Sequence, residues 1–372
     1  MLPRVKINYL NGQLGTVPES EDGLFGLVFV GVDFPPNVQN MIAYSVRSVA
    51  DLEAKGFTAE AYAEVHRQVE EYYKEAEAGT KLVLVFSDED TYTTVLTSND
   101  KDLIDIIAKE NLRGLFLYKM GIVSDVSTAV KAAQALSEAA ADERYSPVFV
   151  CLSVYGEDDF STSANNRVCL LNGSTYEGSS SCPGLMAGRL ASIPVHRNLG
   201  RVRDGALNAD VMYIMDDVVY PGMAYVADLH DKCHITPRAY VGLSGYYFAD
   251  DCMACDPTDD YAHLTARRTV DKAYRIAYRT LVQYMLDEIE VNEDGTMQNG
   301  VLKSWQQAVE NAINRQMTAK GELSATDGEG CVCFIDPTQN VLATSRIELT
   351  LKVRPYGYAR FIDVNLGFQV TA

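Results

Sequence analysis

The chain has 372 residues, of which 47% are hydrophobic and 22% charged, a composition typical of a soluble globular protein with two or three domains. Its net charge of −19 excludes nucleic acid as a main partner, because binding phosphate requires a basic surface. No apolar run approaches the roughly 20 residues that a membrane helix needs, so membrane insertion is not expected.

The first residues suggest an arm at the N-terminus. Met1 to Lys6 lacks the apolar core of a signal peptide, so we expect folding and assembly in the cytoplasm. Val5, Ile7 and Tyr9 then alternate with polar neighbours, as in a strand. We therefore interpret residues 1–20 as an N-terminal arm that carries a short strand.

Residues 21–155 alternate between strand-like and helix-like segments. The predicted strands are Phe25–Val32, Lys81–Phe86, Gly114–Tyr118 and Pro147–Val154, and the predicted helices are Thr58–Ala78, Asp100–Asn111 and Ser127–Ala141. Strands separated by helices predict an α/β domain, with a mostly parallel sheet and flanking helices.

Residues 156–260 form a middle region rich in Gly, Ser, Asn, Tyr and Asp, which predicts irregular structure with one short helix at Cys182–Ser192. Residues 261–372 are more regular and predict an α+β domain. Residues 260–372 carry only 12 Lys and Arg against 14 Asp and Glu, so most of the negative charge precedes them. A nearly neutral surface can pack against other protein more readily than a strongly acidic one.

The C-terminal domain has two predicted helices and two predicted strands. Apolar residues recur at helical spacing over His263–Ile289 and Val301–Met317. Strict alternation follows over Arg346–Val353 and again over Phe361–Val370, with a turn at residues 354–357 between them. The pattern predicts a terminal β-hairpin with one buried side.

Motifs for chemistry are missing from the sequence. There is no Walker-type phosphate loop, no GxGxxG after a strand, no GxSxG elbow and no HExxH. We therefore expect no catalytic residues and no cofactor. The strand ends of residues 21–155 are the place where a ligand-binding protein or an enzyme of this fold would hold its ligand.

Eight cysteines are spread along the chain, and the default expectation is buried free thiols. A cluster of His230, Cys233, His234, Cys252, Cys255 and His263 could supply a tetrahedral zinc site and a zinc-stabilised interaction module. Its spacing fits none of the common zinc modules, so we expect packing residues and assign no metal. Whether Cys233, His234, Cys252 and Cys255 bind an ion is left open.

The aspartates around this cluster also invite a metal interpretation. Asp250, Asp251, Asp256, Asp259 and Asp260 lack the DxDxDG spacing of a calcium loop. We interpret them as a solvated acidic loop.

An ordered series of segments resembles the contractile phage tail sheath proteins. Arg267–Tyr278 resembles their long helix. It is followed by an Asn-x-Asp-Gly turn at residues 292–295, an amphipathic helix, Gly321–Leu323 and a closing segment from Pro355 to Phe368. Upstream, residues 188–195 and 200–205 resemble the sub-family found in Bacteroidetes-type phages and prophage-like elements.

The resemblance implies a structural subunit of a helical polymer, not an enzyme. Sheath subunits surround an inner tube, and their terminal arms add strands to the sheets of neighbours. The partners implied are other copies of the chain, the tube protein, and the baseplate and tail terminator proteins, in the tail of a virion.

The resemblance also assigns roles to residues. Those implied to polymerise the chain are Val5, Ile7, Tyr9, Ile362, Val364, Leu366, Phe368 and Val370. The helix Val301–Met317 is the candidate to face the tube, with Lys303, Arg315 and Lys320 supplying positive charge.

Overall fold

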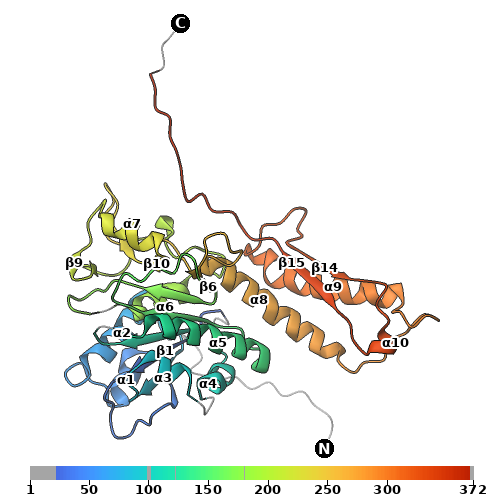
Figure 1. Cartoon of the computed structure of the whole chain (residues 1–372), viewed down its shortest axis with the longest axis horizontal. Helices are drawn as coiled ribbons and strands as arrows, with labels where there is room; N and C mark the ends of the chain where they lie inside the picture. Colours follow the sequence, from blue (N-terminus) through green and yellow to red (C-terminus); the bar gives the residue numbers. More distant parts are fainter. Residues whose placement is uncertain (1–21, 99–101, 122, 180, 369–372) are drawn as a thin grey trace, which may run out of the picture. The chain divides into compact units, whose positions relative to one another are not determined.

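A computed structural model of the chain describes residues 22–98, 102–121, 123–179 and 181–368 (Figure 1). These residues form two compact units, one ending at Arg275 and the other beginning at Ile276. Helix α8 (Leu264–Leu281) contains the boundary. Among the described helices, none is both long and apolar enough to cross a membrane.

The first unit is built on a seven-stranded sheet. Its order is β10 (His234–Ile235), β7 (Val168–Leu171), β5 (Phe149–Ser153), β4 (Gly114–Lys119), β1 (Phe25–Val30), β3 (Leu82–Ser87) and β2 (Ala43–Val46). All neighbours are parallel except β2, which is antiparallel to β3. Phe25 of the central strand β1 lies opposite Leu82 of β3 on one side and Gly114 of β4 on the other. The predicted parallel sheet is confirmed, and β7 and β10 extend it with strands from residues 156–260.

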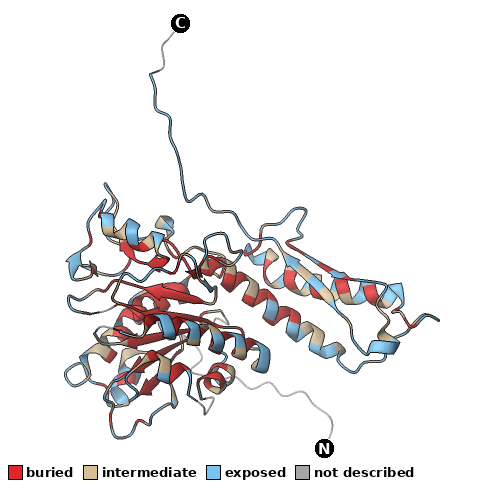
Figure 2. Cartoon of the chain, viewed as in Figure 1, coloured by how far each residue is buried: buried red, intermediate tan, exposed pale blue. Residues whose placement is uncertain are grey.

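Helices cover both faces of this sheet. Helices α1 (Val49–Ala54), α2 (Ala63–Glu75) and α6 (Pro183–Ser192) share one buried core with Phe25, Leu27 and Phe29 of β1. Helices α3 (Tyr92–Leu96), α4 (Asp102–Glu110) and α5 (Val126–Arg144) share the other core with Val28 and Val30. Because both faces of the sheet are covered, every residue of β1 and β3 is buried, which explains the unbroken apolar runs in the sequence (Figure 2).

Helices α2 and α6 approach each other backbone to backbone. A Cβ added at Gly184 would lie 1.8 Å from the carbonyl oxygen of Gln68, and one at Gly188 would lie 2.4 Å from that of Tyr72. The buried Gln68 side chain accepts a hydrogen bond from the N–H of Gly184 at 2.9 Å and donates one to the carbonyl of Ser181 at 3.2 Å. Glycine at both positions is therefore required for this crossing.

The remainder of the first unit is composed of short elements. They are β6 (Ala164–Asn165), a 3₁₀ turn (Val202–Asp204), β8 (Tyr213–Ile214), β9 (Asp217–Val218), α7 (Ala224–Asp231), β11 (Pro237–Arg238), β12 (Tyr247–Phe248) and β13 (Ala254–Cys255). The first residue that the structure describes, Asp22, is bound by Lys272 and Arg275 of α8.

The second unit contains α9 (Asn299–Gln316) and a two-stranded sheet of β14 (Cys331–Ile335) and β15 (Leu349–Val353), joined through α10 (Val341–Thr344). Single 3₁₀ turns lie at Val282–Tyr284 and Thr318–Lys320. The predicted helix His263–Ile289 is too long, because α8 ends at Leu281. Val282, Met285 and Leu286 beyond it are exposed, so packing does not favour further helical turns.

The predicted terminal hairpin is wrong in its pairing. Strand β15 pairs with β14, antiparallel, with Cys331 opposite Val353 and Ile335 opposite Leu349. The described part of the second predicted strand, residues 361–368, forms no strand and is exposed throughout.

Candidate interaction surface of the C-terminal unit

One face of the β14–β15 sheet is buried against α9. Along β14, Cys331, Cys333 and Ile335 are buried, while Val332 and Phe334 between them are more than half exposed. Leu302 of α9 belongs to the same core cluster as Ile335. Alternation along β14 therefore sets an inner face towards α9 and an outer apolar face towards solvent.

Side chains of α9 close the outer edge of β14. The N–H of Cys333 donates a 2.8 Å hydrogen bond to Oε1 of Glu310, and Nε2 of Gln306 donates a 3.0 Å hydrogen bond to the carbonyl of Cys333. These two backbone groups would otherwise be available to a neighbouring strand. A third strand is therefore disfavoured on this side.

The outer edge of β15 is open within the described residues, where the sheet has no third strand. Cys333 directs its backbone groups away from β15, so its opposite residue, Leu351, must direct its own away from β14. Leu349 and Val353 share this orientation because bonding alternates along an antiparallel pair. The backbone groups of three residues on β15 thus face outward as acceptors and donors for an added strand.

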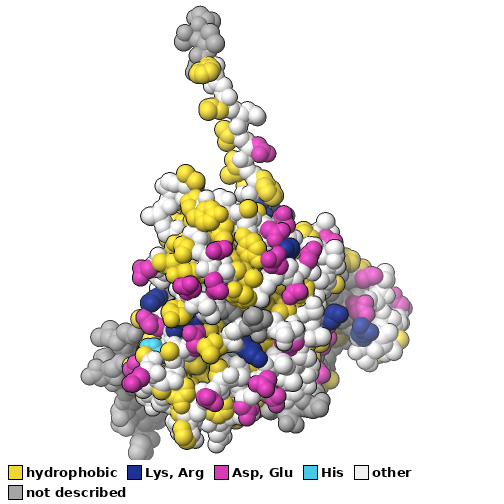
Figure 3. All heavy atoms as spheres, turned by 60° about the vertical axis from the view of Figure 1, so that its left-hand side comes forward, with side chains coloured by type: hydrophobic (Ala, Val, Ile, Leu, Met, Phe, Trp, Pro, Cys, Tyr) yellow, Lys and Arg dark blue, Asp and Glu magenta, His cyan; other side chains and the backbone are white. Residues whose placement is uncertain are grey.

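The tail that follows β15 is extended and apolar. Phe361, Ile362, Val364, Leu366 and Phe368 are between 77% and 101% exposed. From Ile362 onward they alternate with Asp363, Asn365 and Gly367, so one face of an extended chain is apolar. Figure 3 shows hydrophobic side chains standing out along this tail. Exposed apolar side chains at this density are characteristic of a binding segment.

The residues predicted to polymerise the chain are only partly described. Ile362, Val364, Leu366 and Phe368 lie on the exposed tail. The other four, Val5, Ile7, Tyr9 and Val370, lie outside the described residues.

The three predicted tube-facing cations are all exposed. Lys303 and Arg315 lie on α9, and Lys320 lies in the 3₁₀ turn after it. Because an α-helix rises 1.5 Å per residue, Lys303 and Arg315 are about 18 Å apart along the axis. The structure therefore exposes these charges without gathering them into one cluster.

Two parts of this surface were missed from the sequence. Strand β14 has a signal, a short apolar run between Gly330 and Asp336-Pro337, which is typical of a strand. The hydrogen bonds that Glu310 accepts and Gln306 donates have no signal in the sequence, because both residues look like ordinary polar positions of an amphipathic helix.

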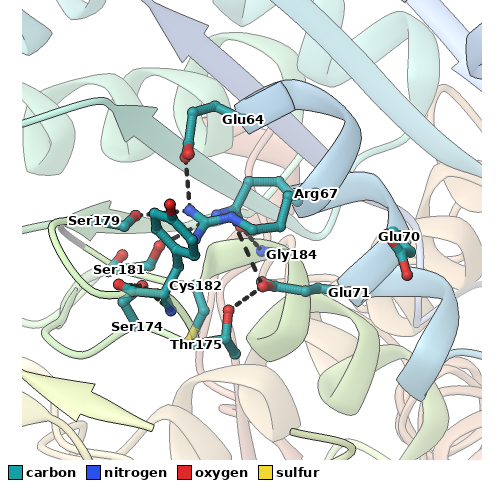
Figure 4. Close-up of polar contacts among 12 residues, drawn as sticks. Glu64, Arg67, Glu70, Glu71, Ser174, Thr175, Ser179, Ser181, Cys182 and Gly184 are labelled. Atoms are coloured by element: carbon teal, nitrogen blue, oxygen red, sulfur yellow. Dashed lines mark hydrogen bonds and ion pairs between the residues drawn. The ribbon is translucent and has the colours of Figure 1, made fainter. Parts of the chain in front are cut away.

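The strand ends of the first unit carry a polar network (Figure 4). Nη2 of Arg67 donates to Oε2 of Glu64 at 2.6 Å and to Oγ of Ser179 at 2.7 Å. The Tyr118 hydroxyl, near the end of β4, donates to the same Glu64 oxygen at 2.5 Å. Glu71 lies 4.0 Å from Arg67 and accepts a hydrogen bond from Thr175.

This network does not present a ready anion site. Two carboxylates balance the charge of Arg67, while burial raises the pKa of Glu71 against the opposing effect of Arg67. A hollow of about 390 Å³ nearby is lined by Thr175, Tyr176, Glu177, Gly178, Tyr213 and Asp216. Its acidic residues and open shape lack the convergent apolar lining typical of small-molecule sites.

The structure brings only part of the predicted Cys/His set together. Nε2 of His234 bonds to the carbonyl of Asp158 at 2.7 Å, and Sγ of Cys233 lies 3.4 Å from the carbonyl of Cys255. All eight cysteines are buried and free of disulfides, as expected. Two members of the set, His230 and Cys252, lie together with Asp250.

The interpretation of a solvated acidic loop is wrong at two positions. Asp250 and Asp251 are 8% and 1% exposed. Nδ2 of Asn198 donates to Oδ1 of both, at 2.6 and 2.8 Å, and so compensates for their burial.

Solved structures with the same fold are components of contractile particles. A chain of the anti-feeding prophage helical sheath in its contracted state has a TM-score of 0.67 at 17% identity, covering 99% of both chains. A chain of the anti-feeding prophage baseplate has a TM-score of 0.67 at 16% identity, covering 100% of this chain and 99% of that one. The sheath tail protein of Desulfitobacterium hafniense has a TM-score of 0.58 at 11% identity, covering 95% of this chain and all of that one.

These likenesses show that the chain has the fold of contractile sheath proteins over its full described length, a mixed α/β fold with a large, mostly parallel sheet. No curated protein matches the chain. Family models match nearly all of it, the DUF2586 N-terminal domain over residues 2–252 and the DUF2586 C-terminal domain over residues 260–372. The chain belongs to the DUF2586 family.

Proposed function

We propose that this protein is the structural subunit of a contractile tail sheath. It polymerises into a helical cylinder around an inner tube and contracts to drive the tube through a target envelope. The observation that carries the proposal is that the second unit has both an exposed apolar tail and an open strand edge on β15. The fold shared with a chain of a contracted helical sheath supports it.

In this proposal the tail of one subunit adds a strand to β15 of a neighbour. Residues 361–368 span about 26 Å when extended, enough to run along the five residues of β15. The outward backbone groups of Leu349, Leu351 and Val353 supply hydrogen bonds. Because the apolar residues alternate, one face of the extended tail is buried against the neighbouring subunit. This burial stabilises the joint by about 1.5–3 kcal/mol for each large side chain buried.

The N-terminal arm makes the second joint. Val5, Ile7 and Tyr9 have the same alternation as the tail, and Val370 continues the tail's apolar face. Joints made of donated strands let rigid bodies repack during contraction while the subunits stay connected. Two terminal connections per subunit are sufficient to build a continuous lattice.

The remaining partners follow the same proposal. Lys303, Arg315 and Lys320 face the inner tube, and the ends of the cylinder meet the baseplate and the tail terminator. The role is structural, with no catalysis and no cofactor. Subunits assemble in the bacterial host cytoplasm and end in the tail of a virion, or in an equivalent prophage or injection particle. The resemblance of residues 188–195 and 200–205 supports membership of the sub-family found in Bacteroidetes-type phages and prophage-like elements.

Electron microscopy of the purified protein tests this function. We expect negatively stained full-length protein to form hollow cylinders, and a variant lacking residues 361–372 to remain folded and monomeric. A four-site variant, with Ile362, Val364, Leu366 and Phe368 changed to Ser, should also fail to polymerise. The matched control changes Asp363 and Asn365 to Ser and should form cylinders. Cylinders from the truncated chain, or a monomeric full-length chain at high concentration, would refute the proposal.

A further inference from the structure

Three side chains of metal-ligating type converge in the first unit. His230 lies in the last turn of α7, and Asp250 and Cys252 lie in the segment between β12 and β13. One ligand atom from each lies within 4.8 Å of the others. Nε2 of His230 is 3.7 Å from Oδ2 of Asp250. Nitrogen, oxygen and sulfur donors from two separate segments therefore surround one point.

A second set shares Asp250. Ligand atoms of Asp250, Asp251 and His263 also lie within 4.8 Å of one another. Nδ1 of His263 is 3.2 Å from Oδ1 of Asp251, close enough for an ion pair, but it makes no hydrogen bond. Oδ2 of Asp251 is already bound by the N–H of Thr265 at the start of α8.

Hydrogen bonds hold the shared carboxylate in place. Oδ1 of Asp250 accepts from Nδ2 of Asn198 at 2.6 Å and from the N–H of Asp251 at 2.9 Å. Both donors act on the same oxygen, so Oδ2 is the oxygen that faces His230. In metal sites, a carboxylate that binds the ion is held in this way by hydrogen bonds from outer-layer groups, here Asn198 and the Asp251 N–H.

We propose that His230, Asp250 and Cys252 bind one zinc ion, with water as the fourth ligand. A mixed set of imidazole, carboxylate and thiolate suits zinc, whereas magnesium and calcium prefer oxygen donors alone. Ligand atoms at zinc-bond lengths from a tetrahedral ion are about 3.3–3.7 Å apart, so the His230–Asp250 separation of 3.7 Å already fits. His230 is partly exposed, which gives the ion a route from solvent.

The ion would join the end of α7 to the segment that leads into α8. The proposal goes beyond the assembly function and does not depend on it. The competing state is a proton: the Asp250 carboxylate, as hydrogen-bond acceptor for the protonated imidazole, raises the pKa of His230, so a charged ion pair could fill the same place. A metal-binding measurement separates the two.

The test uses the full-length chain, stripped of metal with a chelator and titrated with zinc by calorimetry. We expect one zinc ion per chain. His230→Gln and Cys252→Ser should each weaken binding by more than about 100-fold, and Asn198→Ala by about 10–100-fold, as for other outer-layer residues. The matched controls, His66→Gln and Cys233→Ser, change the same residue types outside the set and should bind as the parent does.

Cobalt supplies a second readout. Cobalt-loaded protein should show a thiolate charge-transfer band that Cys252→Ser removes and Cys233→Ser keeps. Should Cys252→Ser misfold, His230→Gln and Asn198→Ala carry the same comparison. The proposal is overturned if no zinc binds, if the cobalt spectrum has no thiolate band, or if Cys233→Ser abolishes binding. Cylinders formed by zinc-free protein would leave the assembly function intact in each of these cases.

Discussion

The carboxylate of Glu310 accepts a 2.8 Å hydrogen bond from the backbone N–H of Cys333. With the bond from Gln306 to the carbonyl of Cys333, α9 occupies the backbone groups at the middle of β14. The two-stranded sheet is thus closed on the β14 side and open on the β15 side. This asymmetry fixes where a donated strand can bind.

Removing the Glu310 carboxylate should destabilise the second unit and expose the backbone N–H of Cys333 on the edge of β14. Glu310→Ala leaves the Cys333 N–H without its charged acceptor, which costs about 1.5–3 kcal/mol in the free energy of unfolding of the second unit. Hydrogen exchange at the Cys333 amide should become faster, and urea unfolding should shift to lower concentration. Glu293→Ala, at an exposed position, is the control and should change neither. Unchanged exchange in Glu310→Ala would show that the helix does not protect this edge.

The open edge can be blocked without breaking the β14–β15 pair. Leu351 directs its N–H outward, so Leu351→Pro removes a donor that only an added strand would use, and proline is tolerated on an edge strand. Leu351→Ala removes side-chain packing but keeps the N–H. We expect the alanine variant to form cylinders and the proline variant to stay monomeric with an unchanged circular dichroism spectrum. Equal polymerisation of the two would place the joint elsewhere.

Local patterns predicted the four central strands of the sheet in the first unit. The strands at Phe25, Lys81, Gly114 and Pro147 were found because a sheet buried on both faces leaves unbroken apolar runs. The parallel arrangement followed from the helices between them. These features depend only on short-range patterns in the sequence, so local rules are sufficient to predict them.

The C-terminal pairing could not be predicted in the same way. Two alternating segments around a turn at Pro355 favour a hairpin by local rules, but alternation does not specify a partner. Strand β14 has the advantage of a face buried on α9, a long-range contact that no local pattern records. The alternating residues of the tail form no strand between 361 and 368 and are exposed, which agrees with the proposed strand exchange.

The prediction that Asp250 and Asp251 are solvated failed for a similar reason. Asp250 and Asp251 look solvated in the sequence because acidic residues surround them. Their burial depends on Asn198, which lies about fifty residues earlier and binds both. His230 and Cys252 both belong to the sequence-based cluster, whereas Asp250, which lies with them, does not.

The two faces of the tail should respond differently to the same charge. Leu366→Asp places a carboxylate on the apolar face and removes a side chain whose burial contributes about 1.5–3 kcal/mol. The critical concentration for polymerisation should rise by about 10–100-fold, since each 1.4 kcal/mol is a factor of ten. Asn365→Asp adds the same charge on the opposite face and should shift it by far less, as measured by sedimentation. Equal effects would mean that net charge, not strand burial, governs assembly.

Asp22 fixes the beginning of the described chain to α8. Its carboxylate lies 2.5 Å from Nζ of Lys272 and 2.9 Å from Nη2 of Arg275, and its side chain is 17% exposed. Burial acts to raise the pKa of Asp22, but the ion pairs with Lys272 and Arg275 outweigh it and hold the pKa below its usual value. A carboxyl with a lowered pKa in the folded state stabilises that state above its unfolded pKa, near 3.9.

Asp22→Asn should therefore destabilise the first unit by about 2–4 kcal/mol at neutral pH, because two largely buried cations lose their shared anion. The difference from the parent should be constant above about pH 5 and shrink as the pH falls through the lowered pKa, where the parent carboxyl also becomes neutral. Urea unfolding of the unpolymerised chain at several pH values measures this. Asp33→Asn, at an exposed position, serves as the control and should differ little from the parent at any pH. A difference between Asp22→Asn and the parent that persists undiminished in acid would mean that packing around Asp22, and not its charge, holds α8 to the start of the described chain.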